Sequence, residues 1–310
     1  MPLLVLPNCD VKEAANEVKF ITKALNFVFI IAIVSLVFSY TTGIGEVYSE
    51  GLNRRAFAWL GDSFSPVMAF FFYYFTFRNK LISAAISALC IIVIMKAKMC
   101  IIMVALGYLA YLFIISKSVL TLRRFCLYIA IVCTVSIGVI LFINAQDYLT
   151  KDVNSISLSG NNRLLSLEAG LAFFRSSPWL GVGANQTFTL LNSGFDIEAL
   201  GSYDKNNPFF EINQVHNSFI RVLAELGIGG FLLFVGFCIA IISESYAVLV
   251  KTYPLPQSDL RALLMACGLW LISFVLFYQT VGWFEPGHPQ LAWLVCFLTL
   301  MNFLIKVKKL

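Results

Sequence analysis

The stretch Ala262–Val281 reads ALLMACGLWLISFVLFYQTV and contains no charged residue. A helix of about 20 residues can cross the hydrocarbon core of a bilayer, so this stretch predicts a transmembrane helix. The whole chain has the same character, since 59% of its 310 residues are hydrophobic and only 13% are charged. A soluble domain of this length could not bury so much apolar surface in one core. The sequence therefore predicts an all-α polytopic membrane protein.

Other apolar runs predict the remaining membrane helices and bring the total to about eight spans. They lie at Leu25–Gly43, Phe64–Phe77, Leu81–Met95, Met99–Ser116, Phe125–Asn144, Phe219–Ser243 and Gln290–Ile305. The chain then divides into an N-terminal membrane region at 1–144, a long polar loop at 145–218 and a C-terminal membrane region at 219–310. We expect about five spans in the first region and about three in the last.

The distribution of basic residues predicts the orientation of these spans. If the N-terminus lies in the cytoplasm, the cytoplasmic ends and loops hold 13 basic and five acidic residues. The opposite side then holds the other 9 of the 22 basic residues and the other 12 of the 17 acidic residues. This asymmetry predicts that both termini are cytoplasmic and that the loop at 145–218 lies outside.

The long loop contains an apolar run, Leu164–Phe174, which is too short to cross a bilayer. Its large apolar residues can line one face of a helix; they are Leu164, Leu165, Leu167, Leu171 and Phe174. We expect a helix half-sunk in the outer membrane interface, ending at Ser176-Ser177-Pro178.

Several cations lie on the outer side, against the usual charge bias. Lys96 and Lys98 occupy a very short outer turn, Arg54 and Arg55 are adjacent in the first outer loop, and Arg163 opens the apolar run of the long loop. The lysines could simply extend to water, and the arginine pair could simply be solvated. A cation at a helix N-terminus, however, is unfavourable without an anionic partner. Together these residues would suit a phosphate or diphosphate at the bilayer surface.

The two histidines, His216 and His288, both fall on the outer side. His216 directly precedes Asn217, where the long loop re-enters the membrane, whereas His288 lies in a turn rich in Pro and Gly. A lone loop histidine is often structural, but a neutral imidazole at this place could also serve as a general base. Without a histidine or aspartate metal motif, we expect no metal and no cofactor. The short clusters of cytoplasmic bases give no support for nucleic-acid binding.

Three segments carry a resemblance to a known family. The first is NNRLLSLEAG at 161–170 leading to SPWLGVG at 177–183, the second is HNSF at 216–219 followed by LAELGIGG at 223–230, and the third is Ala97-Lys98. Together they resemble the bacterial O-antigen ligase and O-antigen or exopolysaccharide polymerase superfamily, chiefly over residues 161–234. At Ala97-Lys98 the family usually has Ser-Arg, so this chain keeps the charge there but loses bidentate geometry.

The resemblance implies a GT-C-like glycosyltransferase of the bacterial inner (plasma) membrane, with its active site on the periplasmic face. Its donor would be a glycan on undecaprenyl diphosphate, used without a metal or a nucleotide sugar. Arg163 and Lys98, assisted by Arg54 or Arg55, would bind the diphosphate, while His216 acts as the base and Asn217 orients it or the acceptor. Family members usually have several further spans before the first outer loop. We therefore expect a naturally short chain or one incomplete at its N-terminus.

Within the family, the reaction could polymerise repeat units of O-antigen, exopolysaccharide or capsule, or it could transfer the glycan onto lipid A-core as a ligase. The segment Gly61–Pro66 following Arg54-Arg55 resembles exopolysaccharide polymerases more closely, and this resemblance favours the polymerase. The expected partners are the lipid-linked donor, a glycan or lipid A-core acceptor, and membrane lipids. A polysaccharide or lipid transporter is the alternative from another class, but no inverted repeat supports it. A structural scaffold would leave Arg163 and His216 unexplained.

Overall fold

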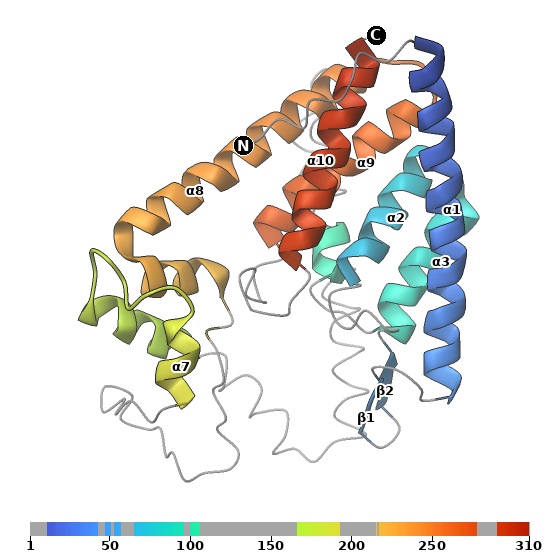
Figure 1. Ribbon diagram of the computed structural model, residues 1–310. Coiled ribbons are helices and arrows are strands. Elements are labelled where there is room, and N and C mark those ends of the chain that lie inside the picture. Colours follow the sequence, from blue (N-terminus) through green and yellow to red (C-terminus); the bar gives the residue numbers. More distant parts are fainter. Residues whose placement is uncertain are drawn as a thin grey trace, which may run out of the picture.

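The computed structural model describes residues 11–42, 47–50, 53–56, 65–95, 100–105, 166–192, 215, 217–277 and 290–309. Figure 1 shows most of the helices side by side in a bundle, with a small hairpin and a separate helical unit at its lower end. The predicted span Phe125–Asn144 and most of Met99–Ser116 lie outside the described residues.

Six of the predicted spans coincide with helices, although several helices are longer than expected. The elements are α1 (Val11–Thr42), β1 (Val47–Glu50), β2 (Asn53–Ala56), α2 (Ser65–Phe77), α3 (Leu81–Leu89), the π-helix η2 (Cys90–Ile94), α7 (Gln186–Asn192), α8 (Ser218–Thr252), α9 (Asp259–Phe277) and α10 (Gln290–Lys309). Residues 100–105 and 166–176 are also helical. By length and composition, Asn16–Thr42 and Ser218–Thr252 could each cross a membrane. The described chain is thus mainly helical and apolar, and the number of eight spans stays a prediction.

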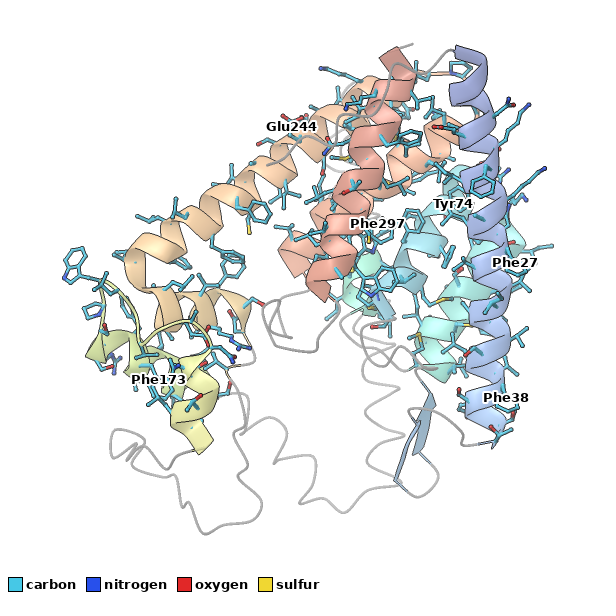
Figure 2. All side chains as sticks on the ribbon, viewed as in Figure 1. Phe27, Phe38, Tyr74, Phe173, Glu244 and Phe297 are labelled. Atoms are coloured by element: carbon cyan, nitrogen blue, oxygen red, sulfur yellow. The ribbon has the colours of Figure 1, made fainter. Side chains whose placement is uncertain are left out.

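Helix α9 lies at the centre of the bundle and packs against α2, α8 and α10. All its side chains from Ala262 to Val275 are buried. Phe297 of α10 reaches the Trp270 ring of α9, with ring centroids 4.1 Å apart (Figure 2), and the Trp270 indole donates a 2.6 Å hydrogen bond to the carbonyl of Pro66. Gly268 allows α8 to approach closely, because a Cβ at this position would lie 3.1 Å from the Leu249 side chain.

The turn between α2 and α3 is tied to the start of α9. Arg78 forms an ion pair with Asp259 at 2.7 Å and donates a 2.9 Å hydrogen bond to the hydroxyl of Tyr74. The Gln257 amide also donates to the carbonyl of Phe77. In Figure 1, α1 begins and α10 ends at this same end of the bundle. These are the chain segments that the charge distribution predicts on one side of the membrane. Which side of the membrane they meet stays a prediction.

A two-stranded antiparallel hairpin, β1–β2, follows α1 and was not expected from the sequence. In its register Arg55 pairs with Tyr48, and Arg54 pairs with Ser49. Strand β2 contacts η2, the π-helical end of the α3 run. The hairpin therefore brings the positions of Arg54 and Arg55 beside the segment that leads towards Lys98.

Removing the Tyr73 hydroxyl should weaken the bundle. This hydroxyl donates to the carbonyl of Met103 at 2.9 Å and lies 3.1 Å from the Ser273 hydroxyl, so it links three helical segments. We expect Tyr73→Phe to lower the free energy of unfolding by about 1 kcal/mol, measured by denaturant titration of purified protein in mixed micelles. The exposed Tyr253 provides the control, and Tyr253→Phe should leave stability unchanged. Equal stability of the Tyr73→Phe protein and wild type would contradict the role of this bond.

Candidate functional site

The candidate site is built around the start of α8, where the sequence predicted the re-entry of the long loop. Asn217 is the N-cap of α8, and its side-chain oxygen accepts hydrogen bonds from the backbone N–H groups of Phe219 and Ile220 at 3.0 and 3.1 Å. These bonds satisfy two of the donors that a helix N-terminus leaves open. Both hydrogen bonds are accepted by the side-chain oxygen Oδ1 of Asn217. The side-chain Nδ2 group is a donor that these two bonds do not use. The cap thus fixes the direction in which the chain enters α8.

Helix α8 is broken at Gly227, whose φ of 63° and ψ of −166° lie far from helical values. We call the part before the break, residues 218–226, the entry segment. In Figure 1 α8 bends sharply here, and the entry segment runs across the direction of the longer part. The predicted span Phe219–Ser243 therefore contains a break that the sequence did not indicate, and the long apolar part of α8 begins only after Gly227.

Residues 178–183, here named the glycine loop, bind the end of the entry segment. The N–H groups of Val182 and Gly183 donate to the carbonyls of Ala224 and Glu225, both at 2.9 Å. From the other side of the break, the N–H of Ile228 donates to the carbonyl of Pro178 at 2.9 Å. Backbone groups that a helix break leaves open must find partners when they are away from water. The glycine loop supplies these partners.

Two glycines permit this contact because each faces main-chain atoms. A Cβ on Gly181, which has φ +71°, would lie 2.3 Å from the backbone of Glu225. A Cβ on Gly227, which has φ +63°, would lie 2.4 Å from the carbonyl oxygen of Trp179. Positive φ is also unfavourable for any residue with a Cβ. The glycine loop and the break in α8 therefore require glycine at both positions.

A buried ion pair fastens the two parts further. Arg221 Nε lies 3.0 Å from Glu225 Oε1, and the two side chains are only 2% and 7% exposed. Glu225 also accepts hydrogen bonds from the Thr187 hydroxyl and, at 2.9 Å, from the backbone N–H of Asn185. Arg221 Nη2 in turn donates to the side-chain oxygen of Asn185 at 2.9 Å. The other three residues therefore all bind the Glu225 carboxylate, Arg221 and Thr187 at Oε1 and Asn185 at Oε2.

This network links the start of α8 to residues beyond the glycine loop. Removing one partner from a buried ion pair typically costs about 3–5 kcal/mol, because it leaves an uncompensated charge. The glycine loop, the start of α7 and the entry segment should therefore move as one body. Arg221 and Glu225 were not among the predicted site residues. Their spacing of four positions, at the start of an otherwise apolar helix, was the signal that could have found them.

The helix at 166–176 packs against the entry segment through small residues. Ala169, Phe173 and Ala224 form one buried cluster (Figure 2), and a Cβ on Gly170 would lie 2.6 Å from the Ile220 side chain. Residues 166–176 are helical and overlap the predicted run Leu164–Phe174, while the position of this helix in the membrane interface stays a prediction. Leu167 is only half-buried, since the small residues allow the closer approach.

The structure describes the backbone of three predicted site residues, in two separate elements. Asn217 caps α8, while the backbone of Arg54 and Arg55 lies in β2 against η2. His216, Arg163 and Lys98 lie outside the described residues. The hairpin and the unit containing α7 occupy the same end of the molecule in Figure 1. Among the residues that the structure describes, no three His, Cys, Asp or Glu side chains are grouped so that they could hold a metal ion.

Comparison with known proteins gives one family match. The family model described as O-antigen ligase matches residues 81–235, half of the chain. This range includes α3, η2, the helix at 166–176, the glycine loop and the entry segment. No curated protein matches the chain.

Substitution of Gly227 should separate the glycine loop from α8. We expect Gly227→Ala to lower the free energy of unfolding by more than about 2 kcal/mol, because it combines positive φ with a collision against backbone. Gly229 is the matched control, since nothing lies within 4 Å of a Cβ there. Gly229→Ala should raise stability by about 0.5–1 kcal/mol through helix propensity. Thermal unfolding in detergent would measure both variants, and equal effects would show that the break does not require glycine.

Proposed function

The chain belongs to the O-antigen ligase family, and from this membership we propose that it transfers a glycan from undecaprenyl diphosphate to an acceptor hydroxyl. The family implies a membrane glycosyltransferase activity of the ligase or polymerase type. We further propose that the acceptor is a second glycan, so that the product is a polymer of O-antigen, exopolysaccharide or capsule repeat units.

One observation carries this proposal. The entry segment is bound to the glycine loop by backbone hydrogen bonds and to Asn185 and Thr187 by the buried pair of Arg221 and Glu225. Asn217 caps its first turn. A site that acts on a large substrate at a membrane surface needs a reactive group held in a fixed position. His216 directly precedes the capping residue, so its backbone is joined to the most strongly fastened part of the unit.

In the proposed reaction His216 is the general base. The acceptor hydroxyl oxygen forms a bond to the anomeric carbon while its proton passes to the neutral imidazole. The bond between that carbon and the phosphate oxygen breaks, and its electron pair leaves with undecaprenyl diphosphate. One direct displacement inverts the anomeric configuration. Asn217 orients the base or the acceptor through its side-chain amide.

Fixed cations would stabilise the charge that develops on the leaving diphosphate. We assign this role to Arg163 and Lys98, with assistance from Arg54 or Arg55. The contact of β2 with η2 supports a shared contribution from the hairpin and Lys98, which follows η2 by four residues. Arg54 and Arg55 occupy successive positions in β2, and such positions lie on opposite faces of a strand. Only one of the two should therefore assist.

The second candidate is transfer of a finished glycan onto lipid A-core. The description of the matching family as O-antigen ligase favours this alternative. Analysis of surface glycan and lipid-linked glycan in a deletion strain separates the two functions. Loss of chain length indicates a polymerase, whereas full-length chains stranded on the lipid carrier indicate a ligase.

For location, we propose the bacterial inner membrane with both termini in the cytoplasm and the site on the periplasmic face. The coarser conclusion, a bacterial membrane protein, follows from the family match and the apolar helices. The charge asymmetry of the loops supports the finer orientation. In this orientation the glycine loop and the hairpin meet the outer leaflet.

Substitutions of His216 test the proposed base. We expect His216→Ala to lose about 10²–10⁴-fold in rate while the protein still inserts and folds. His216→Gln retains a hydrogen-bonding amide but cannot accept the proton, so it should be equally slow. Wild-type activity should fall as the pH is lowered, because an imidazolium cannot accept the proton. A reconstituted assay with lipid-linked donor would measure both. A His216→Gln protein with wild-type rate and pH profile would mean that the base lies elsewhere.

Substitutions of Arg163 test the proposed diphosphate contact. Arg163→Ala should abolish most glycan formation without loss of membrane insertion, and Arg163→Lys should restore part of it, because lysine keeps the charge but not the bidentate geometry. Lys98→Arg is the converse variant and should be tolerated, since arginine is the residue usual in the family. Unchanged glycan in cells with Arg163→Ala would remove this residue from the mechanism.

A further inference from the structure

The glycine loop exposes two large apolar side chains. Trp179 is 75% exposed and Leu180 is 83% exposed, the highest value among the exposed large hydrophobic residues of the described chain. Exposure of adjacent Trp and Leu side chains to water is unfavourable, at about 25 cal/mol per Å² of apolar surface. A surface of this kind usually marks a contact with a partner or a membrane.

The backbone that carries these side chains is fixed. The N–H of Gly181 donates to the carbonyl of Ser177 at 2.9 Å, and the carbonyl of Pro178 accepts from Ile228. The main chain of Trp179 lies against Gly227 so closely that no Cβ would fit between them. The exposure therefore belongs to a rigid turn that holds both side chains outwards.

The apolar surface continues onto α8. Leu226 and Ile228, which flank the break, are 42% and 39% exposed, and Leu232 and Leu233 follow at 63% and 79%. These residues belong to Ser218–Thr252, a helix long and apolar enough to cross a membrane. Figure 1 shows the glycine loop beside the bend of α8. The surroundings that cover the exposed apolar side chains of α8 should therefore also cover Trp179 and Leu180, at the tip of the glycine loop.

We propose that Trp179 and Leu180 form a lipid anchor that inserts into the bilayer between the headgroups and the acyl chains. Tryptophan favours this depth because its ring is apolar and its indole N–H can bond with water or headgroups. The anchor would hold the glycine loop, and with it the entry segment, at the membrane surface. That the anchor enters the leaflet holding the lipid-linked donor rests on the proposed function. That the anchor contacts lipid does not rest on it.

Fluorescence quenching of the full-length protein in phosphatidylcholine vesicles tests the anchor. The chain has five tryptophans, so the emission of Trp179 is obtained as the difference between wild type and Trp179→Phe. The quenchers are phosphatidylcholine with a doxyl group near the headgroup and, separately, aqueous iodide. Unlabelled vesicles serve as the control, and Trp179→Phe retains an aromatic side chain that should not disturb folding.

We expect the doxyl lipid to quench the Trp179 emission several-fold more strongly than iodide does. Stronger quenching by iodide would show that the tip lies in water and would overturn the proposal. Resistance to both quenchers would also overturn it, because the tip would then be covered by protein, either a partner or a second copy. None of these readings requires activity, so the anchor and the proposed transferase function can fail independently.

Discussion

The arrangement of the site depends on one constraint, which is that backbone N–H and C=O groups buried away from water need partners from the protein itself. The break at Gly227 interrupts the regular hydrogen bonding of α8. The glycine loop replaces the missing partners with bonds to Ala224 and Glu225 before the break and from Ile228 after it. A bend that would be costly in an isolated membrane helix therefore becomes the joint between the entry segment and the long apolar part.

The charged pair near this joint has a different role from the backbone bonds. Arg221 and Glu225 lie on one turn of the entry segment, but Asn185 and Thr187 come from the chain beyond the glycine loop. The pair therefore stabilises a contact between segments about 40 positions apart in sequence, which local helix formation alone could not achieve. Ion pairs with low exposure in such a place are commonly associated with function, because desolvation makes them a poor source of stability alone.

Sequence patterns predicted the helices of the bundle well, since long apolar runs have few other structures available in lipid. Helix α10 begins at Gln290 as expected, α2 ends at Phe77 as expected, and α3 begins at Leu81 as expected. The break in α8 was missed because glycine is common in membrane helices, so that Gly227 by itself does not indicate a break. The contact of the helix at 166–176 with the entry segment was not predicted, because a hydrophobic pattern marks the leucines, whereas close approach depends on Ala169 and Gly170. Of the predicted site residues, Asn217 has a described side chain, and its capping bond arises from backbone geometry that residue spacing does not reveal.

The reciprocal contact of Gly181 and Gly227 limits how this region can diverge. Each glycine faces main-chain atoms of the other segment, and those atoms are the same whichever side chain is attached. A second substitution elsewhere in the pair of segments therefore cannot create the missing space, as it often can when two side chains collide. Suppressors of a lesion at either glycine should be rare, and insertions or deletions that shift one segment along the other are the changes most capable of restoring the fit.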